Sequence, residues 1–234
     1  RQMCIRDRPN PKTIPPLYEL LKCSVLCSTA SIESDSKINS RNRGAIEGKG
    51  EWTVNGDPTE IALLISAAKG GVTAGSLSDM RKIHEIPFDS ETKMMTVITR
   101  SPSGQETAYI KGAADILLNK CAFVMTSNGE VPIDRIVTDK INAEISSLSK
   151  RALRVLALAK KEVKAGESHS GGLVFLGLAA MQDPPREEAK AAIKKCSAAH
   201  IKTVMITGDH KETAMAVAKE AGLLKGGKAV TGAE

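Results

Sequence analysis

The sequence predicts an α/β protein whose 234 residues form two parts of different architecture. Up to about residue 180, helical segments accompany short strands joined by tight turns, which is typical of an α+β domain with an antiparallel sheet and flanking helices. Beyond that point, strand and helix alternate with short loops, which indicates a parallel, doubly wound sheet that the chain begins but does not complete. The composition suits a globular protein, because 26% of the residues are charged and 41% are apolar.

The helices of the first part carry recognisable signals. Residues 17–30 have apolar side chains at close to helical spacing, and the polar, Gly- and Ser-rich residues 34–50 predict a mobile loop. In the next helix Asp57 can cap the N-terminus, Pro58 suits the first turn and Glu60 can complete a capping box, while a Gly-Gly pair ends the helix. We therefore expect two helices, one on each side of the loop.

Strands and a hairpin follow. Alternating apolar and β-branched residues indicate strands, and Ser-Asn-Gly is a hairpin turn signal. The expected elements are strands over 84–88, 94–99, 107–110 and 123–125, a turn at 127–129 followed by a strand around Val131, an amphipathic helix over 137–150 and a strand over 154–159.

The second part has longer apolar runs. Leu173 to Ala180 is nearly continuous in apolar residues, as in a strand buried on both faces. Asp183 can cap a helix that ends near Ala199. We expect a second buried strand over 203–206 and a helix over 211–221 that stops at a glycine.

Charge and aromatic content limit the possible partners. The formal charge is +6, the isoelectric point is near 9.0, and aromatic residues are only 3% of the chain. So few rings argue against stacking on single-stranded nucleic acid, and no nucleic-acid partner is expected. A phosphate-bearing small ligand or a solvated positive surface accounts for the mild basic excess.

The cysteines indicate a reducing compartment, because their number is odd, at five, and their spacing resembles no disulfide framework. Cys23 and Cys27 lie four residues apart on an expected helix and could pair as metal ligands. No second pair with metal-ligand spacing accompanies them, so small buried hydrophobes are the favoured interpretation and no metal site is predicted.

Two segments bear on membranes and boundaries. The longest apolar stretch, residues 173–181, is about half of what a bilayer crossing needs, so no membrane span is expected. Residues 1–8 alternate in charge and fit nothing that follows them, so we interpret them as a tag or a sequence-assembly remnant.

Thr207-Gly208-Asp209 is the first candidate site. It follows the expected strand at 203–206, and ligands of open α/β sheets gather at the carboxyl ends of strands, near helix N-termini that favour phosphate. A hydroxyl, a flexible glycine and a carboxylate there could hold a phosphoryl group. A strand-to-helix turn needing only glycine and a cap is the structural alternative.

Several short segments form a recognisable series along the chain. The segments are Leu26-Cys27-Ser28-Thr29-Ala30, Gly56-Asp57-Pro58-Thr59-Glu60, Phe88 with Lys93-Met94-Met95, Lys111-Gly112-Ala113, Arg154 to Ala159, Met181-Gln182-Asp183-Pro184-Pro185-Arg186 and Val204-Met205-Ile206-Thr207-Gly208-Asp209. In this order they resemble segments of P-type cation ATPases, and the resemblance runs from about residue 17 to residue 232.

The resemblance implies domains and roles. It makes residues 9–180 the nucleotide-binding domain and residues 181–234 part of a phosphorylation domain with a haloacid-dehalogenase-like, Rossmann-like fold. The implied roles are adenine stacking for Phe88, a hydrogen bond from the adenine amino group for Glu60, a border of the nucleotide for Lys93, Lys111 and Gly112, a phosphate contact for Arg154, a hinge position near the nucleotide for Asp183 and Arg186, and a phosphoryl-facing catalytic loop for Thr207, Gly208 and Asp209.

The same resemblance implies ATP and Mg²⁺ as cofactors, with the main Mg²⁺ ligands outside this chain. The family's DKTGT and TGDGVND motifs do not occur here. We therefore expect the chain to bind ATP at the cytoplasmic face of a membrane without forming an aspartyl phosphate and without binding the transported cation. Its partners would be the actuator and transmembrane domains of the same pump, and calcium is the favoured ion.

Two other functions stay open on the residues. A soluble haloacid-dehalogenase-class phosphatase would share the parallel-sheet domain, but it needs an Asp-x-Asp nucleophile segment and none is present. A stand-alone nucleotide-binding regulator would need only the first domain.

Overall fold

A computed structural model describes residues 10–34, 52–151, 153–163, 171–182, 187–207, 211–224 and 230. They belong to two compact units, one of residues 1–138 and 156–179 and one of residues 139–155 and 180–234. The sequence predictions that lie outside the described residues are those for the leader at 1–8, the loop at 35–50, Asp183, Arg186, Gly208 and Asp209.

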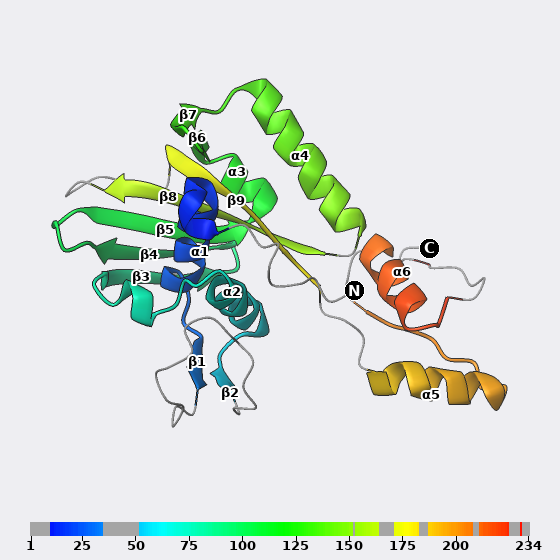
Figure 1. Ribbon diagram of the computed structural model, residues 1–234. Helices are drawn as coiled ribbons and strands as arrows, with labels where there is room; N and C mark the ends of the chain where they lie inside the picture. The colour runs from blue at the N-terminus through cyan, green and yellow to red at the C-terminus, as the bar shows by residue number, and fades with distance from the viewer. Residues whose placement is uncertain are drawn as a thin grey trace. The chain divides into compact units, whose positions relative to one another are not determined.

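The first unit holds nearly all the strands (Figure 1). Its elements include the strands and helices expected from periodicity and turn signals, and also strands at 31–34 and 52–55 and a short helix at 114–118 that were not predicted. They are η2 (Pro11–Thr13), α1 (Pro15–Leu26), β1 (Ser31–Ser34), β2 (Trp52–Asn55), α2 (Pro58–Lys69), η3 (Gly75–Leu77), β3 (Arg81–Asp89), β4 (Met94–Arg100), β5 (Glu106–Ala113), α3 (Ala114–Leu118), β6 (Cys121–Thr126), β7 (Gly129–Pro132), β8 (Arg154–Val163) and β9 (Leu173–Met181).

Seven strands form one sheet in the order β3-β4-β5-β8-β9-β6-β7, and β1 and β2 form a separate ribbon. Pairs β3/β4, β4/β5, β5/β8 and β6/β7 are antiparallel, which confirms the predicted antiparallel sheet. The strand predicted over 173–180 is β9, and it joins this sheet, parallel to β6. Its first four residues are buried and most of the rest are half-buried, so two-sided burial is confirmed only for its first half.

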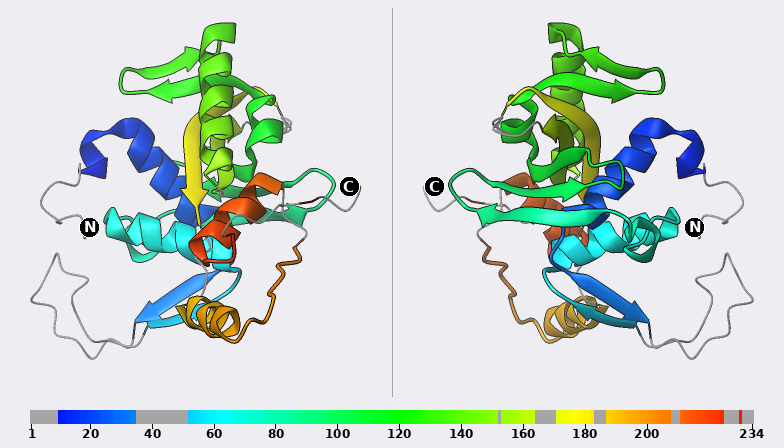
Figure 2. Two further views of the ribbon diagram at one scale, coloured as in Figure 1. Left: turned by 90° about the vertical axis from the view of Figure 1, so that its right-hand side faces the viewer. Right: turned by 90° about the vertical axis from the view of Figure 1, so that its left-hand side faces the viewer.

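The core of the first unit lies between α1 and the sheet (Figure 1). Cys23 and Cys27 on α1 are fully buried, which confirms that they are small core residues. They pack against side chains of four strands: Met95, Val97, Tyr109, Leu158 and Leu176. A second cluster joins α1 to α2 through Leu21 and Ala67, and in Figure 2 the two helices lie side by side, in blue and cyan.

Strand β3 is one outer edge of the sheet. Its pairing with β4 shifts register twice, between Lys82 and His84 and between Ile86 and Asp89. Pro87 and Phe88 lie in the second shift, which is a β-bulge or similar irregularity. Proline is tolerated at this position because an irregular edge strand does not need the backbone N–H that proline lacks. Ile83, Ile86 and Phe88 are exposed along this edge.

The second unit contains three helices among its described residues: α4 (Arg135–Lys150), whose first four residues belong to the first unit, α5 (Glu187–Ala198) and α6 (Lys211–Glu220). These confirm the predicted helices. His200 follows α5 with a φ of 60°, a left-handed residue after a helix end, and Ile201 N–H closes the turn on the Cys196 carbonyl at 2.9 Å.

The strand predicted over 203–206 is wrong. Residues 201–207 are outside any helix or strand, and Val204 and Ile206 are 71% and 93% exposed. A buried parallel strand needs hydrogen-bonding neighbours on both sides. Among residues 187–207 and 211–224 the structure contains no such neighbour, so no parallel sheet forms in this part of the described chain.

Candidate functional site

The first turn of α2 lies against the chain that leaves α1. The Asp57 side chain accepts a hydrogen bond from Thr59 N–H at 2.8 Å, which confirms the predicted N-cap. Gly56, just before it, has a φ of +125°, and a Cβ there would lie 2.6 Å from the Cβ of Ala30. Only glycine fits this approach, which brings the start of α2 to the turn after α1.

Glu60 points its carboxylate into that turn and not back toward Asp57, so the expected capping box is not what this carboxylate forms. Its Oε2 atom accepts hydrogen bonds from Thr29 N–H and Ala30 N–H at 2.8 Å each, from Thr29 Oγ1 at 2.9 Å and from Ser28 Oγ at 3.2 Å. Glu60 is only 8% exposed. A buried carboxylate requires such partners, because an unpaired buried charge is costly.

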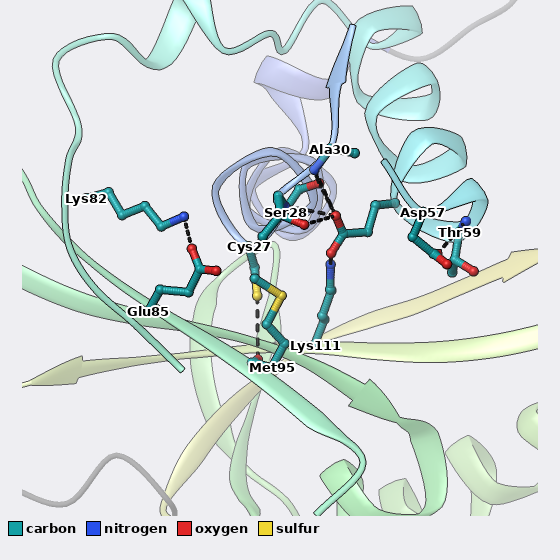
Figure 3. Close-up of polar contacts among 11 residues, drawn as sticks. Cys27, Ser28, Ala30, Asp57, Thr59, Lys82, Glu85, Met95 and Lys111 are labelled. Carbon is teal, nitrogen blue, oxygen red and sulfur yellow. Dashed lines mark hydrogen bonds and ion pairs between the residues drawn. The ribbon is translucent and has the colours of Figure 1, made fainter. Parts of the chain in front are cut away.

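Lys111 of β5 supplies the opposite charge. Its Nζ donates to Oε1 of Glu60 at 2.5 Å, and Lys111 is only 7% exposed. Figure 3 shows the Lys111 side chain reaching up from the sheet to a carboxylate beside Ser28 and Ala30. Burial alone would raise the pKa of Glu60, but the hydrogen bond and charge of Lys111, together with the bonds from Thr29, outweigh it and lower this pKa to about 2.

Two buried thiols bond to the backbone of the strands near the Glu60–Lys111 pair. Cys27 Sγ donates to the carbonyl of Met95 at 3.5 Å, and Met95 is paired with Lys111 across the β4/β5 ladder. Cys23 Sγ lies 3.6 Å from the carbonyl of Ile110. Burial raises the pKa of both thiols, that of Cys27 to about 12. Such thiols stay protonated and unreactive, so they act in packing.

The turn between β3 and β4 is tightly built. Asp89 accepts from Glu91 N–H at 3.1 Å and from Thr92 N–H at 3.2 Å through its two side-chain oxygens, and these bonds lower the pKa of Asp89. Its carbonyl accepts from Lys93 N–H at 2.7 Å. Lys93 has a φ of 53°, a left-handed conformation that costs a non-glycine residue about 1–3 kcal/mol and that the surroundings must stabilise.

The β3–β4 turn packs closely against Gly112. Lys93 offers its carbonyl to Ala113 N–H at 3.1 Å, and a Cβ on Gly112 would lie 2.6 Å from that carbonyl oxygen. The close approach that Gly112 permits in this structure is therefore that of the Lys93 backbone. Its approach to a nucleotide stays a prediction.

Register places the predicted binding residues of the first unit at one end of three adjacent strands. Asp89 pairs with Met94, and Met94 pairs with Gly112, next to Lys111. Phe88 precedes Asp89 and is 61% exposed. The structure therefore places the backbones of Phe88, Lys93, Lys111 and Gly112 at one end of the sheet, where Lys111 pairs with Glu60 of α2.

Other predicted site residues are not part of this set as described. Arg154 is the first residue of β8 and is exposed. Thr207 follows Ile206, outside any helix or strand, and is exposed. Asp183, Arg186, Gly208 and Asp209 lie outside the described residues, so their roles stay predictions.

Sequence reasoning missed three polar residues that shape the site: Ser28, Thr29 and Asp89. Ser28 and Thr29 follow directly on the end of a helix, and hydroxyl residues at such places often bond to neighbouring groups. Asp89 opens a polar Asp-Ser-Glu-Thr run after a strand, which is a turn signal. The sequence contained these turn signals. However, Glu60, the partner of Ser28 and Thr29, is some thirty positions away in the chain, and rules based on neighbouring residues do not predict such a pairing.

Within the described parts of the chain, no group of three or more His, Cys, Asp or Glu side chains could hold a metal ion. No helix among these residues is long and apolar enough to span a bilayer.

Comparison with known proteins agrees with these observations. Residues 16–188 match the family model described as "P-type ATPase, cytoplasmic domain N". The chain is 39% identical over 224 residues to a calcium-transporting ATPase of Bacillus subtilis, covering 93% of the chain and 24% of that protein. It is 39% identical over 225 residues to the cation-transporting ATPase pma1 of Synechocystis, covering 92% of the chain and 23% of that protein.

A third relative transports other ions by name. The chain is 35% identical over 227 residues to the sodium/potassium exporting P-type ATPase cta3 of Schizosaccharomyces pombe, covering 93% of the chain and 20% of that protein. The chain thus spans about a quarter of the length of the curated relatives it matches.

Proposed function

Because the chain belongs to the P-type cation ATPase family, as its cytoplasmic domain N, we propose that it binds ATP at the end of the sheet where Phe88, Lys93 and Lys111 meet. The observation that carries the proposal is a buried Lys111–Glu60 ion pair at the same end of the sheet as Phe88, whose ring is 61% exposed. An exposed ring can offer its face to a ligand, and adenine has a flat face for stacking.

The residues would divide the nucleotide between them. Phe88 stacks on adenine, and the ammonium groups of Lys93 and Lys111 attract the negatively charged remainder of the ligand. Arg154 suits the phosphates because a planar guanidinium bonds two oxygens at once. The resemblance to the family implies that Asp183 and Arg186 lie at the hinge between the two domains. It also implies that Thr207, Gly208 and Asp209 face the phosphoryl group.

In the whole pump, this domain would present ATP to an aspartate elsewhere in the polypeptide, and the aspartyl phosphate would drive cation transport. Such catalysis rests on positioning and charge neutralisation, which fixed cations at a rigid sheet end favour. Mg²⁺ would arrive with the phosphates, since the described residues hold no metal cluster of their own. It would neutralise charge on the transferred group.

Calcium is the proposed ion. Relatives named as calcium transporters include those of Bacillus subtilis and Lactococcus lactis, at 39% and 36% identity. The cta3 relative is named for sodium and potassium, so the choice rests on the larger number of calcium-named relatives and not on a residue of this chain.

Calorimetric titration of the 234-residue chain with ATP tests the proposal. We expect micromolar-to-millimolar affinity, and Phe88→Ala should weaken it by about 1–3 kcal/mol, the scale of base stacking on an aromatic. Phe123→Ala is the matched control, because Phe123 is also exposed, at 39%, but lies on β6, several strands away in the sheet. A folded chain that takes up no ATP refutes the proposal, and equal losses in the two variants remove Phe88 from the site.

A further inference from the structure

One oxygen of the Glu60 carboxylate is fully used. Four donors surround Oε2: the N–H groups of Thr29 and Ala30 and the hydroxyls of Ser28 and Thr29, all within 3.2 Å. A carboxylate oxygen has about two lone-pair sites, so four donors exceed its capacity for well-formed bonds. Any further donor to Glu60 must therefore use Oε1, which already holds the Lys111 ammonium at 2.5 Å.

From this geometry we infer that the turn Ser28–Thr29–Ala30 is a positioning element of the nucleotide site: it fixes Glu60 so that Glu60 holds Lys111 in place, and Glu60 acts on the nucleotide through Lys111. The inference rests on the proposed function, because it gives the turn a role at the ATP site. It departs from the expectation that Glu60 itself receives the adenine amino group.

Lys111 has reason to need such a holder. A lysine side chain loses much of its rotamer entropy when it is fixed, so an unheld lysine would be ordered only as the nucleotide binds. Held by Glu60, the ammonium still has two of its three N–H donors for other acceptors. A cation already fixed in place contributes more to affinity than a mobile one, because the ordering cost precedes binding.

The turn is itself anchored on two sides. Ala30 packs against Gly56, with room for no Cβ on the glycine. Cys27, which precedes the turn, bonds the carbonyl of Met95, the residue paired with Lys111. Glu60 and Lys111 are thus fixed by elements on both sides of the ion pair.

Thr29→Val is the principal test, because valine keeps the shape of threonine and removes one hydroxyl donor from Oε2. We expect the ATP dissociation constant, measured by NMR titration of the full chain, to rise about three- to tenfold, the range for losing one ordinary hydrogen bond, since three other donors remain on Oε2. In a Lys111→Gln background the same change should add nothing, since Glu60 then has no lysine to hold.

The matched control is Thr73→Val, since Thr73 Oγ1 is likewise hydrogen-bonded in a turn, where it accepts from Ser76 N–H at 3.2 Å, in an exposed part of the same unit. It should leave ATP affinity unchanged, and Thr29→Ser should restore the wild-type value. Without nucleotide, the ammonium proton signal of Lys111 should broaden in Thr29→Val and stay sharp in Thr73→Val. Should Thr29→Val fail to fold, Ser28→Ala, which removes the longest of the four bonds, takes its place.

Two results overturn the inference. Equal weakening by Thr29→Val with and without Lys111 shows that Glu60 acts on the nucleotide directly, and unchanged affinity in a folded Thr29→Val chain shows that the turn is only structural. Both leave the proposed function intact. If wild-type chain binds no ATP while the Lys111 signal responds as expected, the proposed function fails, and the turn's hold on Lys111 remains.

Discussion

Two regions of this chain carry the residues assigned to the nucleotide and its phosphoryl group, and they are held in very different ways. At the Glu60–Lys111 end of the sheet, Lys111 and Gly112 lie on a strand with defined register, and the charges of Glu60 and Lys111 are buried in a pair. Residues 201–207, leading to Thr207, lie outside any helix or strand, and Ile206 is 93% exposed. In the sequence, the apolar pattern of residues 203–206 looks like that of the strands in the first unit.

The difference shows what an apolar run means in each place. Val97 and Leu158 are buried because neighbouring strands and α1 cover them. Val204 and Ile206 are equally apolar, but no described strand pairs with the segment that contains them. A site residue on the first segment is therefore positioned by its own unit. One on the second segment lies outside any described helix or strand.

The largest expected effect separates the two partners of the buried ion pair. Glu60→Ala should destabilise the first unit by about 3–5 kcal/mol, because it leaves the Lys111 ammonium buried and unpaired and also strips the Ser28–Ala30 turn of its acceptor. Lys111→Met should cost less, about 1–3 kcal/mol, because Glu60 keeps the four donors on Oε2. Urea unfolding measures the loss of stability in both variants. Equal losses would contradict the view that Lys111 depends on Glu60 more than Glu60 depends on Lys111.

A pair of truncations tests the two regions directly. Leu158→Ala, at a residue with 0% exposure, should lower stability by about 2–5 kcal/mol, since it opens a cavity between α1 and the sheet. Ile206→Ala should stay within about 0.5 kcal/mol of wild type, as for most exposed positions. Thermal unfolding of both variants decides the comparison, and a loss above about 1 kcal/mol for Ile206→Ala would mean that this segment is buried after all.

Gly112→Ala sharpens the account of the site end. The new methyl group would meet the Lys93 carbonyl oxygen at 2.6 Å, and backbone must move to accept it, at a cost of about 1–3 kcal/mol. Gly171→Ala is the control, because no atom lies within 4 Å of its added Cβ and its φ is not in the left-handed region. Chemical denaturation compares the two, and a neutral Gly112→Ala would show that the β3–β4 turn yields easily.

The smallest expected effect is a dependence on acidity. Because folding lowers the pKa of Glu60 from 4.5 to about 2, its contribution is fully present above pH 4.5 and is lost as the pH falls toward 2. Between pH 6 and pH 4, the wild type should lose about 1 kcal/mol more than Glu60→Gln, which has no carboxylate to protonate. Denaturant midpoints at the two pH values measure this, and parallel losses in both proteins would place the acid-sensitive group elsewhere.

Much of the first unit could be predicted from the sequence, because the signals there are local. The Asp57 cap and the hairpin turn before Gly129 involve residues that are near neighbours in the chain. The pairing of Glu60 with the Ser28–Ala30 turn could not be predicted that way, since it joins residues about thirty positions apart. A capping box explained Glu60 equally well at the level of the sequence.

The strand expected at 203–206 failed for a related reason. Its apolar, β-branched residues satisfy the local rule for a buried strand, but burial depends on neighbours that a local rule does not see. The resemblance to the ATPase family supplied what periodicity could not, namely which of the many charged residues to group with Phe88. It was the register of β3, β4 and β5 that then placed Phe88, Lys93 and Lys111 at one end of the sheet.

The irregular pairing of β3 has one further consequence, for solubility. A regular, apolar outer strand invites another chain to add its own strand, which is the first step of many aggregates. Here Pro87 withholds a donor and two register shifts interrupt the edge beside Ile83, Ile86 and Phe88. The same break that leaves a ring open to solvent also denies neighbouring molecules a continuous ladder to extend.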